Sequence, residues 1–212
     1  MHWVLLANGH CQLAPRIQNL LSTADRLVAV DGGGSHLLAM GLTPHLAVGD
    51  MDSIPSELLE LYRRQGVPLH LHPPQKDATD LELALHLAFA GQATRITLLG
   101  ATGGRLDHTL GNLFLLSLCQ AHSVPTCIMD AAQSVYLADS FLELQGTVGD
   151  TLSLMPVTPQ AAGVTLSGLE YPLQNATLHF GTTWGMSNVF TSSTATVRLE
   201  TGRLLVFHLH RD

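Results

Sequence analysis

Six aspartates follow short apolar runs of the sequence, at positions where their carboxylates could meet around one cation. They are Asp31, Asp50, Asp52, Asp77, Asp80 and Asp107. Like charges this close repel each other unless a cation is present. Carboxylate oxygens without an accompanying set of histidines or cysteines are typical ligands of a hard metal ion. The pattern therefore predicts Mg²⁺, which proteins usually hold with one or two carboxylates and substrate phosphates.

Some of these positions have a second interpretation as helix N-caps. Asp107 precedes the apolar stretch 110–118, and Thr79 with Glu82 matches the capping-box spacing. Asp50 and Asp52 are different, because they flank a single residue just past an apolar run. That arrangement favours metal ligands over caps.

Two glycine-rich loops and two basic residues accompany the acids. Gly32–Gly34 and the pair Gly103 and Gly104 allow backbone N–H groups to approach an anion closely. The second loop leads into a predicted helix, whose N-terminus favours phosphate. Arg105 adds a fork-shaped donor and Lys76 a point charge. Neither loop fits the P-loop or the dinucleotide pattern, which excludes those two folds but not nucleotide binding.

His108 and Asn112 are four residues apart in the same predicted helix, so they share one face of it. His108 could donate to a phosphate or transfer a proton. It could equally be a polar residue satisfied beside Asp107. The sequence leaves these alternatives open.

Two further pairs of histidines lie two residues apart in predicted strands: His70 with His72, and His208 with His210. Each pair shares one strand face. A clip of two ligands without a third partner makes a poor zinc site. We therefore interpret all four as ordinary surface or core-edge residues.

The elements that must position these groups alternate along the first 130 residues. Apolar runs such as 3–7, 27–30, 46–48, 67–71 and 96–99 predict strands, and residues 81–89 show helical periodicity. This alternation predicts an α/β domain with a mostly parallel sheet and helices on both faces. Ligands of such sheets bind beyond the carboxyl ends of the strands, and four successive strand ends carry the groups described above.

After Asp130 the helical patterns disappear, and short runs rich in Thr, Val and Leu recur about every ten residues. We expect an all-β sandwich over 133–212, following the α/β domain of 1–132. Tyr171 and Trp184 lie beside turn residues and could stack on a flat ligand, although core packing is the alternative for each. Ser187 and Asn188 offer small polar contacts at a turn.

Composition limits the function further. The 212 residues carry a net charge of −7, with 46% hydrophobic and 13% charged residues. The acidic balance argues against a nucleic-acid partner, and no apolar run approaches the roughly 20 residues of a membrane span. The N-terminus lacks the pattern of a signal peptide. Three cysteines without metal-type spacing predict a reducing, cytoplasmic location.

Taken together, the loops resemble those of the thiamine pyrophosphokinase family in order and spacing. The matching segments are Asp31-Gly-Gly33, Gly49-Asp-x-Asp-Ser53, Lys76-Asp-x-Thr-Asp80 with Glu82, and Gly103-Gly-Arg-x-Asp-His108 with Asn112. Gly168-Leu-x-Tyr-Pro-Leu173 and Ser187-Asn188 look like the thiamine-binding segment of that family. Met51 and Val189 stand where the family often has an aromatic and an acidic residue, respectively.

The resemblance implies an ATP-binding catalytic domain over 1–132 and a thiamine-binding, dimerising β-sandwich over 133–212. It implies a homodimer with thiamine sites between subunits, and Mg²⁺-dependent pyrophosphoryl transfer from ATP to thiamine. The metal ligands would be Asp50, Asp52 and Asp80. The remaining catalytic residues would be Arg105 and Lys76, which neutralise charge, and Asp77 or Asp107; which of these two accepts the hydroxyl proton stays open.

The expected binding residues follow from the same resemblance. The ATP and phosphate set is Asp31, Gly33, Lys76, Thr79, Gly103, Gly104, Arg105, His108 and Asn112. The thiamine set is Asp80, Tyr171, Trp184, Ser187 and Asn188. Two alternatives rank lower: a phosphatase with an Asp50/Asp52 nucleophile pair, which leaves the other loops unexplained, and a non-enzymatic thiamine- or nucleotide-binding protein, which has no need of a metal-binding acid cluster.

Overall fold

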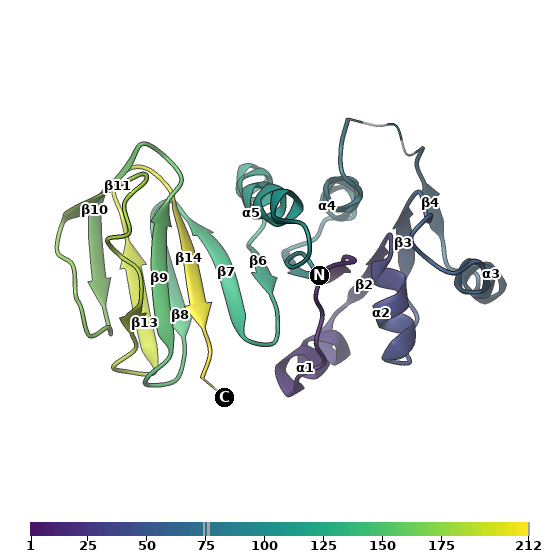
Figure 1. The fold of residues 1–212 in the computed structure, drawn as a ribbon, viewed down its shortest axis with the longest axis horizontal. Coiled ribbons are helices and arrows are strands. Elements are labelled where there is room, and N and C mark those ends of the chain that lie inside the picture. Colours follow the sequence, from purple (N-terminus) through teal and green to yellow (C-terminus); the bar gives the residue numbers. More distant parts are fainter. Residues whose placement is uncertain (74, 76, 212) are drawn as a thin grey trace. The chain divides into compact units, whose positions relative to one another are not determined.

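The computed structural model describes residues 1–73, 75 and 77–211. They separate into two units, Met1–Ala131 and the chain from Ala132 onward (Figure 1). Lys76, which the sequence analysis assigned to phosphate, lies outside the described residues. Within the described residues, no helix has the length and apolar character that crossing a bilayer requires.

The first unit alternates strands and helices as the apolar runs predict. Its strands are β1 (His2–Leu6), β2 (Arg26–Val30), β3 (Leu46–Gly49), β4 (Leu69–Leu71), β5 (Arg95–Leu99) and β6 (Thr126–Met129). Its helices are α1 (Pro15–Thr23), α2 (Gly33–Ala39), α3 (Ser56–Gln65), α4 (Asp80–Ala90) and α5 (Leu106–Ala121). β4 begins two residues later than expected, because the Val67 N–H bonds to Tyr62 O over 2.9 Å in the helix end and Pro68 has no N–H to donate.

The strands of this unit lie in the order β6-β5-β1-β2-β3-β4, and the paired neighbours are all parallel. The prediction of a mostly parallel sheet is therefore confirmed. Alternate residues of β1 and β2 point to opposite faces. Val4, Leu6 and Leu27 share a core with residues of α1, α2 and α3, while α4 and α5 lie on the other side of the sheet (Figure 1).

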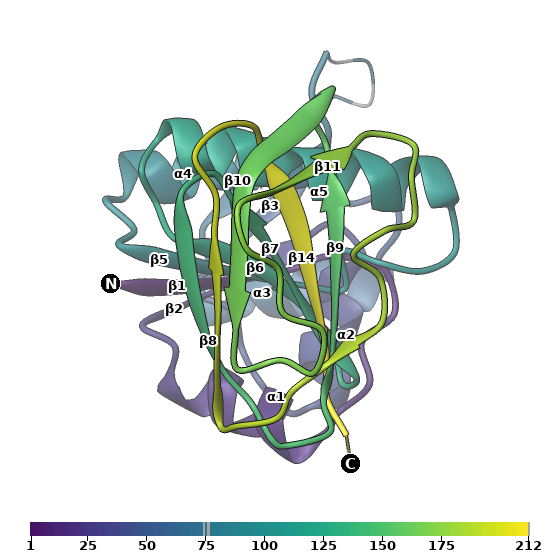
Figure 2. The same ribbon diagram turned by 90° about the vertical axis from the view of Figure 1, so that its left-hand side faces the viewer.

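The second unit contains only strands. They are β7 (Gln133–Ala138), β8 (Phe141–Gln145), β9 (Thr151–Pro156), β10 (Gln160–Ser167), β11 (Ala176–His179), β12 (Asn188–Val189), β13 (Thr194–Arg198) and β14 (Leu204–Leu209). They form one sheet in the order β12-β9-β14-β7 and another in the order β11-β10-β13-β8. The pairings are antiparallel. Figure 2 shows β10 passing in front of β14, one sheet covering the other.

The core of the second unit lies between these two sheets. Leu152, Leu154 and Val206 come from the first sheet, and Val164 and Val197 from the second, all of them buried. The predicted β-sandwich is therefore confirmed. The two-residue strand β12 was not predicted, because Asn188 and Val189 form no alternating run.

Candidate active site

A cavity of about 790 Å³ opens at the carboxyl ends of β1 and β5. These strands are neighbours in the sheet but distant in sequence, since the chain crosses to the other side of β1 between β4 and β5. Backbone hydrogen bonds continue their pairing beyond the strands, from Gly9 N to Gly100 O over 2.7 Å and from His10 N to Thr102 O over 2.8 Å. Open parallel sheets bind their ligands at such a topological switch point.

Three aspartates gather at the ends of the two strands that follow in the sheet. One oxygen atom of each of Asp31, Asp50 and Asp52 lies within 4.8 Å of those of the other two. They meet because β2 and β3 are adjacent parallel strands, so that Asp31 leaves one beside Asp50 leaving the other. Asp31 also lines the cavity.

The setting of Asp31 is unusual for a carboxylate. Its φ of 47° lies in the left-handed region, and its N–H donates to Val48 O over 2.8 Å. Its Oδ1 is buried and, within the described part of the chain, has no hydrogen-bond partner. A buried carboxylate oxygen without a donor costs free energy, and a cation bound beside it would remove that cost.

The segment before α4 contributes to the cavity in a different way. Asp80 and Thr79 both line it, but Asp80 is not one of the three mutually close carboxylates. Asp80 begins α4 instead of leaving a strand. Thr79 is the N-cap, and its hydroxyl oxygen accepts the Glu82 N–H over 3.3 Å, as the capping-box spacing predicts. Asp77 is exposed and is not among the described residues that line the cavity.

The three glycines assigned to phosphate have different surroundings. Gly33 is buried, and a Cβ there would collide with the backbone carbonyl of Leu6, so close packing of α2 on β1 explains it. Gly103 and Gly104 line the cavity with φ of 98° and 63°. A Cβ on Gly103 would come within 2.6 Å of the His10 ring, whereas Gly104 faces open space.

Arg105 and Asp107 pair with each other at the start of α5. Arg105 Nε donates to Asp107 Oδ1 over 3.2 Å and Nη2 donates to Oδ2 over 2.6 Å. Hydrogen bonding to Arg105 lowers the pKa of Asp107 to about 2, and the same pairing raises the pKa of Arg105. The N-cap residue of α5 is Arg105, so Asp107 is not the cap that the alternative interpretation expected.

His108 and Asn112 lie on one face of α5, and both line the cavity. Asn112 Nδ2 donates to Ala101 O over 2.8 Å, which ties the helix to the loop after β5. His108 is exposed to solvent. One of the two residues thus positions the loop, and the other is available to a ligand.

The loop after β1 lines the cavity as well, although it was not predicted to do so from the sequence. Its residues are Asn8, Gly9 and His10. Gly9 is required because a Cβ there would collide with the carbonyl oxygens of Gly100 and Thr102. The sequence does contain a signal for this loop, the Asn-Gly pair directly after the first apolar run. Ligands bind beyond the carboxyl ends of parallel strands, and this holds for the first strand as well as for the later ones.

In the second unit, the aromatic candidates lie on the surface. Tyr171 is 59% exposed and Trp184 55% exposed, so neither serves core packing. Ser187 is exposed, has a φ of 59°, and its N–H donates to Ser153 Oγ over 3.0 Å. All three side chains are accessible to a ligand.

Asn188 is different, because it is only 6% exposed and its carboxamide is used within the protein. Nδ2 donates to Tyr171 O over 2.7 Å, and Oδ1 accepts from Tyr171 N over 3.0 Å and from Val189 N over 2.9 Å. The side chain thus fixes the backbone on both sides of Tyr171. Its place in the structure is that of a positioning residue for Tyr171.

Two family models match most of the chain. The model described as thiamin pyrophosphokinase, catalytic domain, matches residues 17–128, and the one described as thiamin pyrophosphokinase, vitamin B1 binding domain, matches residues 142–205. The chain belongs to the thiamine pyrophosphokinase family. The resemblance inferred from the strand-end loops is thereby confirmed.

Individual relatives agree with this assignment. The thiamine pyrophosphokinase of Bacillus subtilis (strain 168) is 29% identical over 204 residues, covering 95% of each chain. A crystal structure of a Bacillus subtilis thiamine pyrophosphokinase superimposes with a TM-score of 0.89, at 27% identity and full coverage of both chains. The thiamin pyrophosphokinase of Geobacillus thermodenitrificans gives a TM-score of 0.85 at 30% identity, covering 100% of this chain and 99% of its own. These matches favour neither the phosphatase nor the non-enzymatic alternative.

Proposed function

We propose that this chain is a thiamine diphosphokinase that transfers a pyrophosphoryl group from ATP to thiamine, giving thiamine diphosphate and AMP. The thiamine hydroxyl oxygen attacks the β-phosphorus of ATP, and the bond from that phosphorus to the bridging oxygen of the α-phosphate breaks. The chain belongs to the thiamine pyrophosphokinase family, and one observation of its structure carries the proposal. Three carboxylates converge beside a ligand-sized cavity at the topological switch point of the parallel sheet. Such transfers depend on positioning and charge neutralisation more than on covalent chemistry.

The ATP phosphates would lie against the loop after β5. Gly103 and Gly104 leave room for their backbone to approach an anion, and the N-terminus of the 16-residue helix α5 favours negative charge. Arg105 would exchange its hydrogen bonds to Asp107 for phosphate oxygens, as a planar guanidinium can do with little rearrangement. Thr79, His108 and Asn112 line the same space.

The metal site fits Mg²⁺. Its donors are carboxylate oxygens alone, which suits a hard cation, and the buried Oδ1 of Asp31 has a missing partner that a cation would supply. We assign the site to Asp31, Asp50 and Asp52, so Asp31 takes the place that the sequence analysis gave to Asp80. When bound, Mg²⁺ neutralises charge on the phosphate oxygens. Asp80 then remains a candidate for the positively charged thiazolium ring of thiamine.

The pairing with Arg105 also bears on which acid accepts the hydroxyl proton. An acid with a pKa of about 2 is a weak base. While the pair with Arg105 is intact, Asp107 is therefore a poor acceptor of this proton. The low pKa no longer applies once Arg105 turns to the phosphates, so the role stays open between Asp77 and Asp107. Until then, Asp107 would hold Arg105 ready at the mouth of the cavity.

Thiamine recognition is assigned to the exposed residues Tyr171, Trp184 and Ser187 of the second unit. We propose that a homodimer brings this surface of one subunit to the ATP cavity of the other. An apolar stripe on α5 supports a partner surface: Leu106, Leu110 and Phe114 are spaced four residues apart and are 84%, 50% and 52% exposed. A cytoplasmic location stays a prediction.

The test is incubation with ATP, Mg²⁺ and thiamine, followed by separation of AMP from ADP. We expect AMP and thiamine diphosphate in equal amounts, and ADP as the product would refute pyrophosphoryl transfer. Asp52→Ala should keep the fold and lose nearly all turnover. The matched control is Asp139→Ala, which removes an exposed aspartate of the second unit and should leave turnover unchanged. Phosphate release from simple esters without ATP would favour the phosphatase instead.

A further inference from the structure

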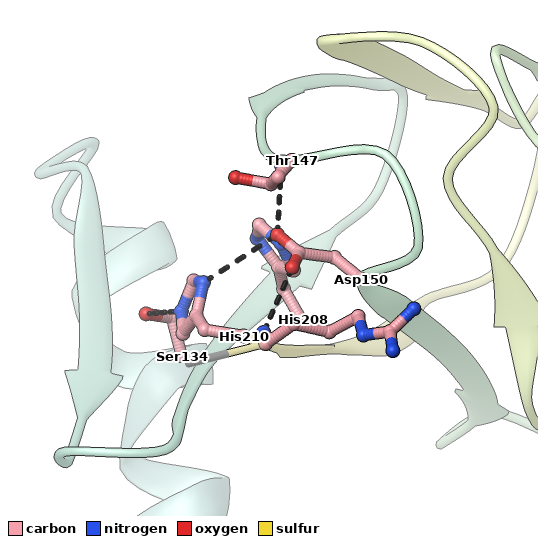
Figure 3. A network of polar contacts seen from close by, with 6 residues as sticks. Ser134, Thr147, Asp150, His208 and His210 are labelled. Carbon is pink, nitrogen blue, oxygen red and sulfur yellow. Dashed lines mark hydrogen bonds and ion pairs between the residues drawn. The ribbon is translucent and has the colours of Figure 1, made fainter.

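A buried polar cluster in the second unit contains none of the residues used by the proposed activity (Figure 3). The side chains of Asp150 and His208 are 2% and 1% exposed, and that of His210 is 18% exposed. His208 Nε2 lies 2.8 Å from Asp150 Oδ2, and His210 Nδ1 lies 3.9 Å from the same oxygen. One ligand atom from each of the three residues lies within 4.8 Å of the other two.

We propose that Asp150, His208 and His210 form a Zn²⁺ site. Two imidazoles and one carboxylate are a common protein ligand set for this ion, with a further position left for water. Zinc bonds of about 2.0–2.2 Å in tetrahedral geometry place ligand atoms roughly 3.3 Å apart. The distances from Asp150 Oδ2 to His208 Nε2 and His210 Nδ1, 2.8 and 3.9 Å, lie on either side of that value. Small side-chain rotations would therefore suffice.

Outer hydrogen bonds hold two of the three ligands, His210 and Asp150. His210 Nε2 is 3.1 Å from Ser134 Oγ, so its other ring nitrogen faces the cluster. The backbone N–H groups of Thr147 and Arg211 donate to Asp150 over 2.9 and 2.8 Å. Metal-binding histidines and carboxylates characteristically have such outer hydrogen bonds, which fix the ring and support the ligand charge.

Packing also confines the site. The ring of Phe190 stacks on His208 with centroids 4.7 Å apart. A Cβ on residue 146 would lie 3.0 Å from both Asp150 Oδ2 and His208 Cε1, so glycine at that position keeps the space beside the pair open. A desolvated, preformed cluster binds a metal without having to be ordered first.

In the sequence, His208 and His210 form a pair of ligands without a third partner, which makes a poor zinc site. The structure supplies that partner from 58 residues away, since the loop between β8 and β9 carries Asp150 to the end of β14. The His70 and His72 pair has the same spacing, and no such group forms around it among the described residues. This pair therefore offers a matched control.

The experiment uses the full chain, stripped with a chelator and titrated with Co²⁺ as a spectroscopic substitute for Zn²⁺. An excess of Mg²⁺ is added to occupy the cluster of Asp31, Asp50 and Asp52 in the first unit, so that Co²⁺ does not bind there. We expect the ligand-field absorption of a nitrogen-containing site of low coordination number, saturating at one equivalent. Zn²⁺ should displace the Co²⁺ signal.

Variants decide whether the signal comes from this cluster. His210→Asn should abolish it and His72→Asn should retain it, with circular dichroism verifying the fold of each. Ser134→Ala keeps all three ligands and should weaken affinity about 10- to 100-fold, as loss of an outer partner does. The absence of a saturable signal in the unmodified chain, or its persistence in His210→Asn, would overturn the proposal. Neither result bears on AMP formation, which does not involve this cluster.

Discussion

The substitution Asp31→Asn tests whether Asp31 is a metal ligand or an acid that stabilises the fold, because the two roles predict opposite changes in the stability of the metal-free protein. Asn removes the charge and tolerates the left-handed φ of 47° at this position. At the 4.8 Å limit between the carboxylates, two unit charges repel by about 1 kcal/mol in water and about 3 kcal/mol at an effective dielectric constant of 20. Asp52 is exposed, so screening keeps the real value near the lower figure.

We therefore expect Asp31→Asn without Mg²⁺ to be more stable than the unmodified chain by about 1 kcal/mol, or roughly 2–4 °C in Tm. Its affinity for Mg²⁺ should fall at least about 10-fold, because even outer partners of ligands contribute that much. AMP formation should fall with it.

The assay is thermal unfolding with and without Mg²⁺, together with turnover at several Mg²⁺ concentrations. A ligand that binds only the folded state raises Tm, so the unmodified chain should gain stability from Mg²⁺ and the variant should gain less. Asp139→Asn is the control and should behave like the unmodified chain. A variant that unfolds earlier without Mg²⁺, yet keeps the full gain from it, would refute the reasoning.

Three further outcomes can be measured. Arg105→Ala should lower kcat roughly 100-fold. Carboxyl NMR should show the pKa of Asp107 returning from about 2 toward its ordinary value. Because the pairing lowers this pKa, the small stabilisation that the pair gives the fold is present above pH 4 and is lost as the pH falls toward 2. Asn188→Ala leaves the N–H and carbonyl of Tyr171 without their partner, so Tm should fall and KM for thiamine should rise more than kcat changes. Leu110→Glu should convert a dimer to a monomer in analytical ultracentrifugation; an unchanged dimer mass would remove the stripe on α5 from the proposed interface.

The fold could be predicted from local sequence patterns, because the periodicity of apolar residues indicates whether a segment forms a helix or a strand. Buried strands such as β5 give continuous apolar runs, and α4 buries Leu81, Ala84, Leu85 and Ala88 on one face. The short strand β12 escaped notice, since its pairing with β9 depends on a partner more than 30 residues away in sequence. Pairing of that kind leaves no periodic signal.

The sequence predicts which loops form the candidate site, but not which side chains of those loops contact one another. The sequence placed Asp31 and Asp80 at strand ends, yet only the strand order shows that Asp31 adjoins Asp50. Asn188 had the right residue type for a substrate contact. Its hydrogen bonds to the backbone of Tyr171 become visible only when the two segments are brought together.

The pairing of β1 with β5 bears on when during synthesis the candidate nucleotide cavity can form. The floor of the cavity needs both strands, and their register joins His2 to Arg95. Closing a loop of that length is entropically costly, and topologies of this kind fold slowly. A growing chain on the ribosome thus lacks the candidate nucleotide cavity until residues up to Asn112 have emerged. ATP bound there would stabilise only chains that have completed this long-range step.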